Sequence, residues 1–389
     1  MKKIGLYLEA APHFGGTFQY NQTMLDALAV LPADRFSVVI GYTSERWLTC
    51  LQDYNLRAVR IPLGFWGRAF GLGWTLLGLP MSWWRALTPL FHPMAKALLR
   101  EHCDLWIFPS YELRSYQFPI PALVTIHDLM FRYEKRFPES ASRWEYFNRE
   151  TICRNNCRWS KGILVESELG RRQMVESYRI SPDRVHVLPN IAPKYMHSTE
   201  VRPDFAAHYR LPAKYIFYPA QFWWHKNHKK LIEAVASLKS ELPDLKLVLS
   251  GGRQNAYAAT VKLVQDLDLV TDVIFSGYLP DTDMPEFYRR ARAMVMPTYY
   301  GPTNIPPLEA FAVGCPVAIS GIYGMPEQAG DAALFFNPDS VEEIADCIRQ
   351  LWTDDQLCAE LAEKGRKREA EWRQDQFNDR VRQIVEAAG

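Results

Sequence analysis

The 389-residue chain is long enough for two ordinary domains, and its 48% hydrophobic and 23% charged residues are typical of a globular protein. The composition excludes a disordered chain, and the formal net charge of +1 gives no sign of a nucleic-acid partner. Lys and Arg outnumber Asp and Glu in residues 1–192, and the balance reverses in 193–389. A mildly basic first half fits an anionic partner or a membrane surface, and equally a solvated face without a partner.

The cysteines and the N-terminus carry little sign of special chemistry. Seven cysteines, an odd number scattered over the chain, argue against a disulfide framework. Cys153 and Cys157 lack a second Cys or His pair at metal-ligand spacing, so we expect no zinc site there. The chain opens directly on a strand pattern without a long apolar leader, which predicts a cytosolic protein.

The first half alternates buried strand patterns with helical ones. An apolar run at 4–10 is followed by Gly15-Gly16 and by a helical pattern over 17–31. This order is typical of the start of an open parallel α/β sheet. Further strands are expected at 36–41, 105–108, 123–126, 163–165 and 185–188. The alternation predicts βαβ units and a doubly wound sheet.

The alternation restarts after a linker near 190–205. Strands are expected at 215–218, 245–249, 273–275, 293–296 and 316–319, with a helical tail from about 341. We therefore predict a Rossmann-like domain over 1–195, a second one over 196–370, and a last helix over 371–389 that crosses back to the first domain.

Residues 69–84 break this pattern, because they contain no charge and lie between Arg68 and Arg85. Sixteen residues with Pro80 among them are too few to span a bilayer comfortably as a helix. Three tryptophans suit an interfacial segment that contacts lipid. A buried helix pair or a lid over an apolar ligand explains the composition as well.

Lys226 stands at the most informative point of the second half. The strand ending near Pro219 is followed by a short loop and by a helix that begins near Asn227. Ligands of open α/β sheets bind at such carboxyl ends of strands. Lys226 and the helix N-terminus together would neutralise a phosphate group. The alternative is a solvated lysine in a loop.

Glu309 belongs to a second such element. A strand ends at Pro297, a loop of small residues follows, and Pro306 or Pro307 opens a helix with Glu309 in its first turn. A carboxylate there is placed to accept hydrogen bonds from a ribose diol. It can equally be a structural residue that complements the helix dipole.

The order of several short motifs resembles glycosyltransferase family 4, whose members are retaining enzymes of the GT-B fold. In the second half the resemblance rests on Lys226-Asn227, Ser250-Gly251-Gly252, Ser276-Gly277-Tyr278, Pro306-Pro307-Leu308-Glu309 and Gly314-Cys315-Pro316. In the first half it rests on Gly15-Gly16 and on His127-Asp128. It covers nearly the whole chain and is weakest over 45–100. The fold it implies is α/β, with two Rossmann-like doubly wound domains facing across a cleft.

The resemblance implies roles for named residues. Gly15 and Gly16 would let the backbone approach the donor phosphate or the acceptor, and His127 would lie beside the transferred sugar. Lys226 would hold the diphosphate and Glu309 the ribose, so His127, Lys226 and Glu309 are the expected catalytic residues. The remaining donor contacts are expected from Gln221, Gly277, Tyr278, Thr303, Asn304 and Ile305.

The resemblance also implies the reaction. It is hexose transfer with retained configuration from a nucleotide sugar, with GDP-mannose the first choice and dTDP-rhamnose the second. It would need no metal and no further cofactor. The acceptor would be a surface polysaccharide such as lipopolysaccharide, or a lipid-linked oligosaccharide. The protein would be cytoplasmic, with peripheral contact to the cytoplasmic face of the membrane through 69–84.

Two positions depart from the family pattern at the donor site. The family usually has a second Glu eight residues before Glu309, where this chain has Gly301, and an Arg five residues before the lysine, where it has Gln221. Pro302 also lacks a backbone N–H that the usual loop offers. His225 or His228 is a candidate to replace the missing cation.

Three other functions remain open from the sequence. An epimerase of nucleotide sugars would use the same fold without an acceptor. A catalytically inactive GT-B subunit that binds glycan or another protein would explain Gly301 and Gln221. A dinucleotide oxidoreductase is the weakest alternative, because neither Gly15-Gly16 nor Gly251-Gly252 continues into Gly-x-Gly-x-x-Gly.

Overall fold

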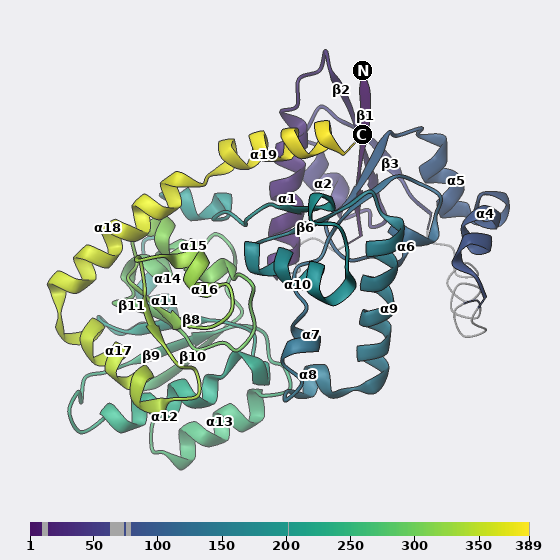
Figure 1. Cartoon of the computed structure of the whole chain (residues 1–389). Helices are drawn as coiled ribbons and strands as arrows, with labels where there is room; N and C mark the ends of the chain where they lie inside the picture. Colours follow the sequence, from purple (N-terminus) through teal and green to yellow (C-terminus); the bar gives the residue numbers. More distant parts are fainter. Residues whose placement is uncertain (10–14, 63–73, 75–78, 201, 389) are drawn as a thin grey trace. The chain divides into compact units, whose positions relative to one another are not determined.

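The chain forms two compact units in the computed structural model, and each is built on a sheet of parallel strands (Figure 1). The structure describes residues 1–9, 15–62, 74, 79–200 and 202–388. Unit 1 comprises Met1–Leu129, Phe147–Pro189 and Gln374–Gly389. Unit 2 comprises Met130–Tyr146 and Asn190–Arg373.

The unit 1 sheet has seven parallel strands in the order β3-β2-β1-β4-β5-β6-β7. Their side chains are mostly buried on both faces, as expected of parallel strands covered by helices. The order reverses between β1 and β4, which makes this pair the topological switch point. The strands are β1 Lys2–Leu8, β2 Phe36–Tyr42, β3 Arg57–Arg60, β4 Leu105–Phe108, β5 Ala122–Thr125, β6 Gly162–Val165 and β7 Val185–Val187.

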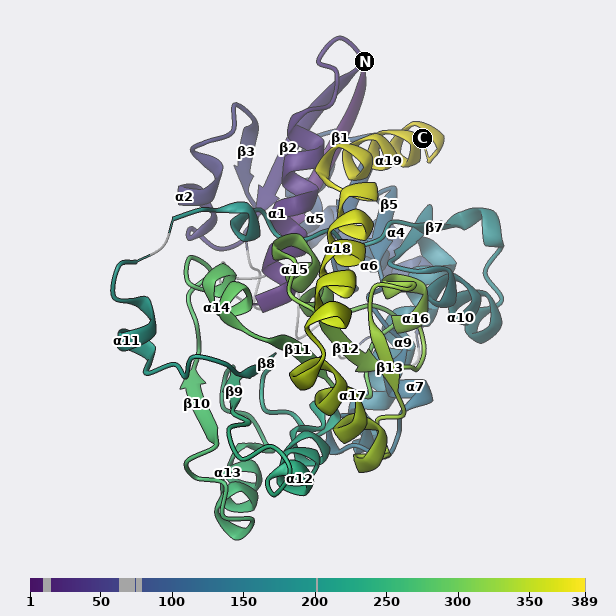
Figure 2. The same ribbon diagram turned by 90° about the vertical axis from the view of Figure 1, so that its left-hand side faces the viewer.

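Helices cover the unit 1 sheet, and the last helix of the chain is one of them. Helix α19 packs against α1, and the two lie side by side in both views (Figures 1 and 2). Arg380 of α19 also donates to the carbonyl of Val187 at the end of β7, 3.2 Å away. The helices are α1 Gly15–Ala29, α2 Trp47–Leu51, α4 Met81–Phe91, α5 Pro93–Arg100, α6 Leu113–Gln117, α9 Arg143–Trp159, α10 Glu168–Tyr178 and α19 Gln374–Ala387, with a short 3-10 turn η1 at Pro182–Arg184.

The unit 2 sheet repeats this plan with six parallel strands in the order β10-β9-β8-β11-β12-β13, and Figure 2 shows them from β10 at the left to β13 at the right. The order reverses between β8 and β11, which is the switch point of unit 2. The strands are β8 Ile216–Pro219, β9 Leu247–Ser250, β10 Val273–Gly277, β11 Ala293–Met296, β12 Val317–Ser320 and β13 Leu334–Phe336.

Helices on both faces of this sheet enclose one large apolar core. Helix α18 packs on α15, and α17 packs on α12. The helices and turns are α7 Met130–Tyr133, α8 Pro138–Ala141, η2 Lys194–His197, α11 Phe205–Tyr209, η3 Trp224–Lys226, α12 His228–Leu238, α13 Tyr257–Asp266, α14 Met284–Arg290, α15 Ile305–Val313, α16 Met325–Ala329, α17 Val341–Thr353 and α18 Asp355–Glu371.

The predicted fold class is confirmed, because both sheets are parallel and doubly wound. The chain divides between Pro189 and Asn190, where the sequence suggested 195, and residues 374–389 lie in unit 1. The segment 130–146, which the sequence analysis placed in the first domain, is grouped with unit 2, where α8 contacts η3 and α7 contacts α8. Strands β3 and β13 were not predicted.

The uncharged segment 69–84 is described only in part. Residues 69–73 and 75–78 lie outside the described residues, so the structure gives no conformation for them. Trp74 donates from Nε1 to the carbonyl of Pro80, 3.2 Å away, and its ring lies 5.4 Å from that of Trp84. Trp84 is buried and Trp83 is exposed. None of the described helices has the length and apolarity that crossing a bilayer requires.

Candidate active site

Lys226 follows the carboxyl end of β8, where the sequence predicted it, and this end lies at the switch point of unit 2. Strand β8 ends at Pro219, and the chain reaches Lys226 through the short turn η3. The ammonium group of Lys226 donates to Oδ1 of Asn304, 3.4 Å away, in the loop that follows β11. The two loops on either side of the switch point are thus joined by the lysine itself.

Asn227 fixes the backbone beside Lys226. It has left-handed dihedral angles, with φ of 59°, and ends η3 where α12 begins. Asparagine is one of the few residues besides glycine that adopts this conformation readily. Its buried amide donates to the carbonyls of Pro297, at 3.0 Å, and of Pro338, at 2.9 Å. Asn227 therefore ties the lysine loop to the ends of two other segments.

The loop after β11 is held by further hydrogen bonds around Asn304. The backbone N–H of Asn304 donates to Oε1 of Gln328 at 2.9 Å, and Nε2 of Gln328 donates to the carbonyl of Asn304 at 2.7 Å. Gly324 approaches the same loop so closely that a Cβ would lie 1.6 Å from the carbonyl oxygen of Pro302. The sequence analysis did not single out Gln328 or Gly324, which lie one βα unit further along the chain.

Glu309 is buried, and its position in the helix differs from the prediction. Helix α15 begins at Ile305, so Glu309 is its fifth residue and not in the first turn. Oε1 accepts a hydrogen bond from Tyr195 at 2.5 Å, and Oε2 accepts one from Tyr288 at 2.6 Å. Burial raises the pKa of the Glu309 carboxyl, although both hydroxyls favour its ionised form.

Two tyrosines thus orient the carboxylate that the sequence assigned to the ribose. Each oxygen of a carboxylate has a second acceptor site, so both can still receive a hydroxyl from a ligand. Sequence reasoning missed Tyr195 and Tyr288 because they come from η2 and α14, far from Glu309 in the chain.

The other predicted donor residues differ in exposure and in their hydrogen bonds. Gly277 ends β10 with φ of 76°, and Tyr278 beside it is exposed. Thr303 accepts a hydrogen bond from Asn190, 3.4 Å away. Gln221 is exposed and turned along the loop, where its Oε1 accepts from the ring N–H of Trp223 at 2.9 Å.

Of the two histidines offered as a replacement cation, only His225 has the right surroundings. His228 is buried and stacks on Phe222, with ring centroids 4.4 Å apart. Burial, with Lys226 nearby, lowers the pKa of His228 to about 3, so this ring is neutral at physiological pH. The ring of His225 stacks on Tyr300 at 4.0 Å, and its Nδ1 lies 3.7 Å from the carboxylate of Glu139.

Glu139 comes from the segment 130–146 and contacts the lysine loop directly. Its Oε1 accepts the backbone N–H of Trp224 at 2.8 Å. Although burial opposes it, the nearby His225 ring and the hydrogen bond from the backbone N–H of Trp224 lower the pKa of Glu139 to about 2. Ser140, next in the chain, accepts the hydroxyl of Tyr300 at 3.0 Å. The segment 130–146, distant in sequence, therefore forms hydrogen bonds with the loops that follow β8 and β11.

His127 lies at the carboxyl edge of the unit 1 sheet, just past β5. Its Nδ1 is 2.6 Å from Oε1 of Glu166, and its Nε2 is 3.0 Å from the carbonyl oxygen of Pro109. The carbonyl can only accept, so Nε2 carries a proton. Burial opposes the charged ring, but the hydrogen bond and charge of Glu166 outweigh it and raise the pKa of His127. Sequence reasoning missed Glu166.

The first strand of unit 1 leads to a partly buried ionic cluster and to the glycine pair. Arg114 pairs with Glu9, and with Glu112 at 2.6 Å. Burial and the neighbouring Glu9 raise the pKa of Glu112 to about 8. Gly15, with φ of 55°, and Gly16 are exposed and open helix α1. These polar groups follow β1 and β4, the switch-point strands of unit 1.

The cysteines that the structure describes are free thiols, and most of them are buried. Cys153 and Cys157 lie on one face of α9 as buried free thiols, and burial raises the pKa of Cys157 to about 12. Over the described ranges, no three His, Cys, Asp or Glu side chains gather in a group that would hold a metal ion.

Two parallel sheets of Rossmann type, the second with a lysine, an asparagine and a buried glutamate beyond its switch point, define a protein of the GT-B glycosyltransferase class. Two family models match the sequence: Glycosyltransferase Family 4 over residues 31–192 and Glycosyl transferases group 1 over 204–368. The chain belongs to this family of glycosyltransferases, as the motif order indicated.

Individual relatives and a solved structure agree with this assignment. The O-antigen chain mannosyltransferase B of Escherichia coli is 28% identical over 282 residues, which are 68% of this chain and 70% of that protein. The serotype-specific mannosyltransferase WbdA of Escherichia coli is 27% identical over 51% of this chain, which spans only 25% of that longer protein. The structure of Anabaena HepE in complex with UDP-glucose matches with a TM-score of 0.74 at 14% identity, over the whole of both chains.

Proposed function

We propose that this protein transfers a hexose, mannose in the first instance, from a nucleotide sugar to a glycan acceptor with retention of configuration. The observation that carries the proposal is the joined pair of loops at the unit 2 switch point, with Lys226 bound to Asn304. Glu309 lies on the helix that follows. GDP-mannose is the first donor to test because the curated relatives are mannosyltransferases by name. dTDP-rhamnose is the second.

In the proposed reaction, unit 2 stabilises the departing nucleoside diphosphate. The bond between the sugar C1 and the diphosphate oxygen breaks, while the acceptor oxygen bonds to C1 from the same face. The acceptor hydroxyl proton passes to the leaving diphosphate. A fixed cation beside the phosphate stabilises the charge that develops, without reorganisation during the reaction. Lys226 supplies that cation, and the backbone N–H groups at the start of α12 add to it.

This chain lacks the family's glutamate at Gly301 and the family's arginine at Gln221. We propose that Glu139 and His225, both in unit 2, take the place of these two charged groups. Glu139 accepts from the loop backbone and lies beside the ring of His225, which Tyr300 covers on one face. A protonated His225, four residues after Gln221, would partly restore the positive charge that the family's arginine supplies at the phosphate.

The acceptor we propose is a surface polysaccharide or lipid-linked oligosaccharide. This choice is supported by the O-antigen chain named in the first relative. The reaction is proposed to need no divalent metal, so the assay is run with a chelator as well as with magnesium.

The test is release of nucleoside diphosphate from GDP-mannose and dTDP-rhamnose in the presence of bacterial glycolipid. Lys226→Ala is compared with Lys229→Ala, which removes an exposed lysine three residues away that pairs with Glu233 at 3.7 Å. We expect the unaltered chain to turn over one of the two donors. Lys226→Ala should lose this activity, and Lys229→Ala should keep it. NMR of the product should show the donor's anomeric configuration. An inverted product, or equal activity of both variants, contradicts the proposal.

A further inference from the structure

Helix α4 presents its apolar side chains to the solvent. Trp83 is 61% exposed, Leu87 41%, Leu90 70% and Phe91 45%. Their spacing of three to four residues places them on one side of the helix. Isolated exposed apolar residues are ordinary, but a continuous stripe on one helix marks a surface that binds something. We call these four residues the α4 stripe.

The orientation of α4 is fixed from its opposite side. Trp84 and Thr88 are buried, and each follows a residue of the α4 stripe by one position. Arg85 donates to the carbonyl of Tyr116 and lies over the ring of Trp159, with its guanidinium carbon 5.0 Å from the centroid. The helix is thus anchored by an arginine and a tryptophan, while its more apolar side faces outward.

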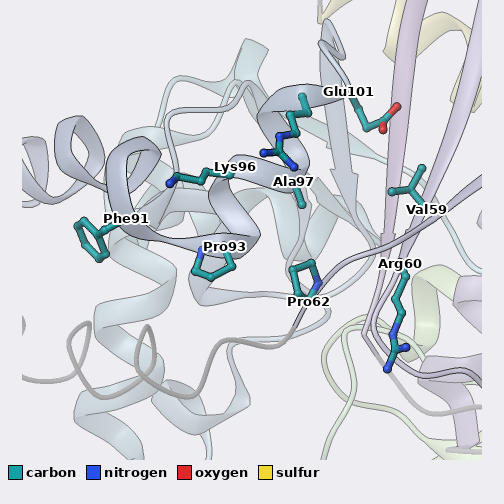
Figure 3. A pocket seen from close by; sticks show the side chains of 9 residues that line it. Val59, Arg60, Pro62, Phe91, Pro93, Lys96, Ala97 and Glu101 are labelled. Carbon is teal, nitrogen blue, oxygen red and sulfur yellow. The ribbon is translucent and has the colours of Figure 1, made fainter.

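A basic pocket adjoins the end of the α4 stripe. Phe91 and Pro93 line it on the α4–α5 side, with Lys96 beyond them, and Arg60 and Pro62 line it from the end of β3 (Figure 3). Its volume is about 460 Å³. Arg100 is also part of its lining, and both Lys96 and Arg100 are exposed. Glu101 lines the pocket as well and pairs with Arg57 at 3.1 Å, and Arg60 pairs with Glu45 at 2.8 Å.

The sequence around this surface has only one sign of charge. Between Asp53 and Glu101 the chain contains six Lys or Arg residues and no Asp or Glu. An exposed apolar stripe beside exposed cations is the chemistry of a helix lying in the interface of an anionic membrane. A second copy of the same surface would bring like charges together, which argues against self-association.

We propose that the α4 stripe and the basic pocket beside it dock unit 1 on an anionic phospholipid bilayer. Trp83, Leu87, Leu90 and Phe91 enter the region between headgroups and acyl chains, and Lys96, Arg100 and Arg60 contact lipid phosphates. This places the membrane contact on 83–100, displaced from the 69–84 segment that the sequence suggested. The surface belongs to unit 1 alone, so the inference does not rest on the proposed transfer reaction.

The experiment is sedimentation of the full chain with vesicles of phosphatidylcholine, with and without phosphatidylglycerol. We expect binding only to the anionic vesicles and weaker binding at high salt. Lys96→Gln should weaken it roughly fivefold, the effect of one basic residue near such a surface. Leu90→Glu should weaken it by more than tenfold, since it removes an apolar contact and adds a like charge to the lipid.

Matched controls separate this surface from general effects. Val270→Glu changes a valine that is 64% exposed in unit 2, and Lys229→Gln removes an exposed lysine of the same unit. Both should bind vesicles like the unaltered chain. The thermal unfolding transitions of Leu90→Glu should match those of the unaltered chain, which shows that this variant is folded.

Three results would overturn the inference. The first is no binding to anionic vesicles, and the second is an equal loss of binding in Leu90→Glu and Val270→Glu. The third is a dimer in lipid-free sedimentation velocity that Leu90→Glu converts to a monomer, because the α4 stripe would then be an interface between copies. Loss of nucleotide binding with intact vesicle binding would contradict the proposed function and leave this surface standing.

Discussion

Asn227 offers the sharpest test of how the lysine loop is built. Its side chain supplies two buried hydrogen bonds, to the carbonyls of Pro297 and Pro338, and its backbone is left-handed. Glycine at this position keeps the left-handed conformation and loses both hydrogen bonds. Alanine loses the hydrogen bonds and also opposes the conformation. The pair of variants therefore separates the two contributions.

The expected magnitudes follow from these contacts. Each carbonyl that loses its partner costs about 1–2 kcal/mol, so Asn227→Gly should lower the free energy of unfolding by about 2–4 kcal/mol. Asn227→Ala should lose about 1 kcal/mol more, because an L-residue with a Cβ resists a left-handed conformation. For a unit of this size, about 1 kcal/mol shifts the melting temperature by roughly 2–4 °C.

Calorimetry of both variants measures these differences, with Asn255→Ala as an exposed asparagine control in the same unit. We expect the melting temperature of unit 2 to fall on the order of 10 °C, and further in the alanine variant. Nucleotide affinity should fall with it, because Lys226 is the neighbouring residue. The reasoning is refuted if both variants melt within about 1 °C of the unaltered chain.

Two further predictions concern buried titratable groups. Burial raises the pKa of Glu309, so its contribution to stability is present at low pH and is lost as pH rises through the folded-state value. Glu309→Gln should therefore keep or raise the melting temperature at neutral pH while weakening nucleotide binding, and a clear loss of stability would be inconsistent with this. The pKa of His127 is also raised, by Glu166, so its stabilisation is complete below the ordinary histidine value and is lost as pH rises above the raised one. In Glu166→Gln, NMR titration should show the His127 pKa falling, and an unchanged value would mean that another group holds the proton.

The fold was predictable because parallel strands buried on both faces leave continuous apolar runs in the sequence. All the strands named from such runs are present. Strand β3, with Arg57 and Arg60 at its ends, and the three-residue β13 were missed because one is charged and the other very short. Neither pattern stands out by periodicity.

The candidate site was only half predictable. Lys226 and Asn304 lie at strand ends, where the topology brings them together, and the sequence located both. Tyr195, Tyr288 and Glu139 come from segments whose positions depend on packing between distant parts of the chain. No local pattern marks a residue whose role is to orient another, so these positioning residues needed the structure.

The central claim is that unit 2 binds a nucleoside diphosphate through Lys226, and thermal stabilisation tests it most directly. The full chain is melted against a panel of nucleoside diphosphates and nucleotide sugars, without metal. A ligand at a hundred times its dissociation constant adds about 2.7 kcal/mol to stability. We predict a clear shift for one base, lost in Lys226→Ala and retained in Lys229→Ala. No shift with any nucleotide, or an equal shift in both variants, would contradict the account.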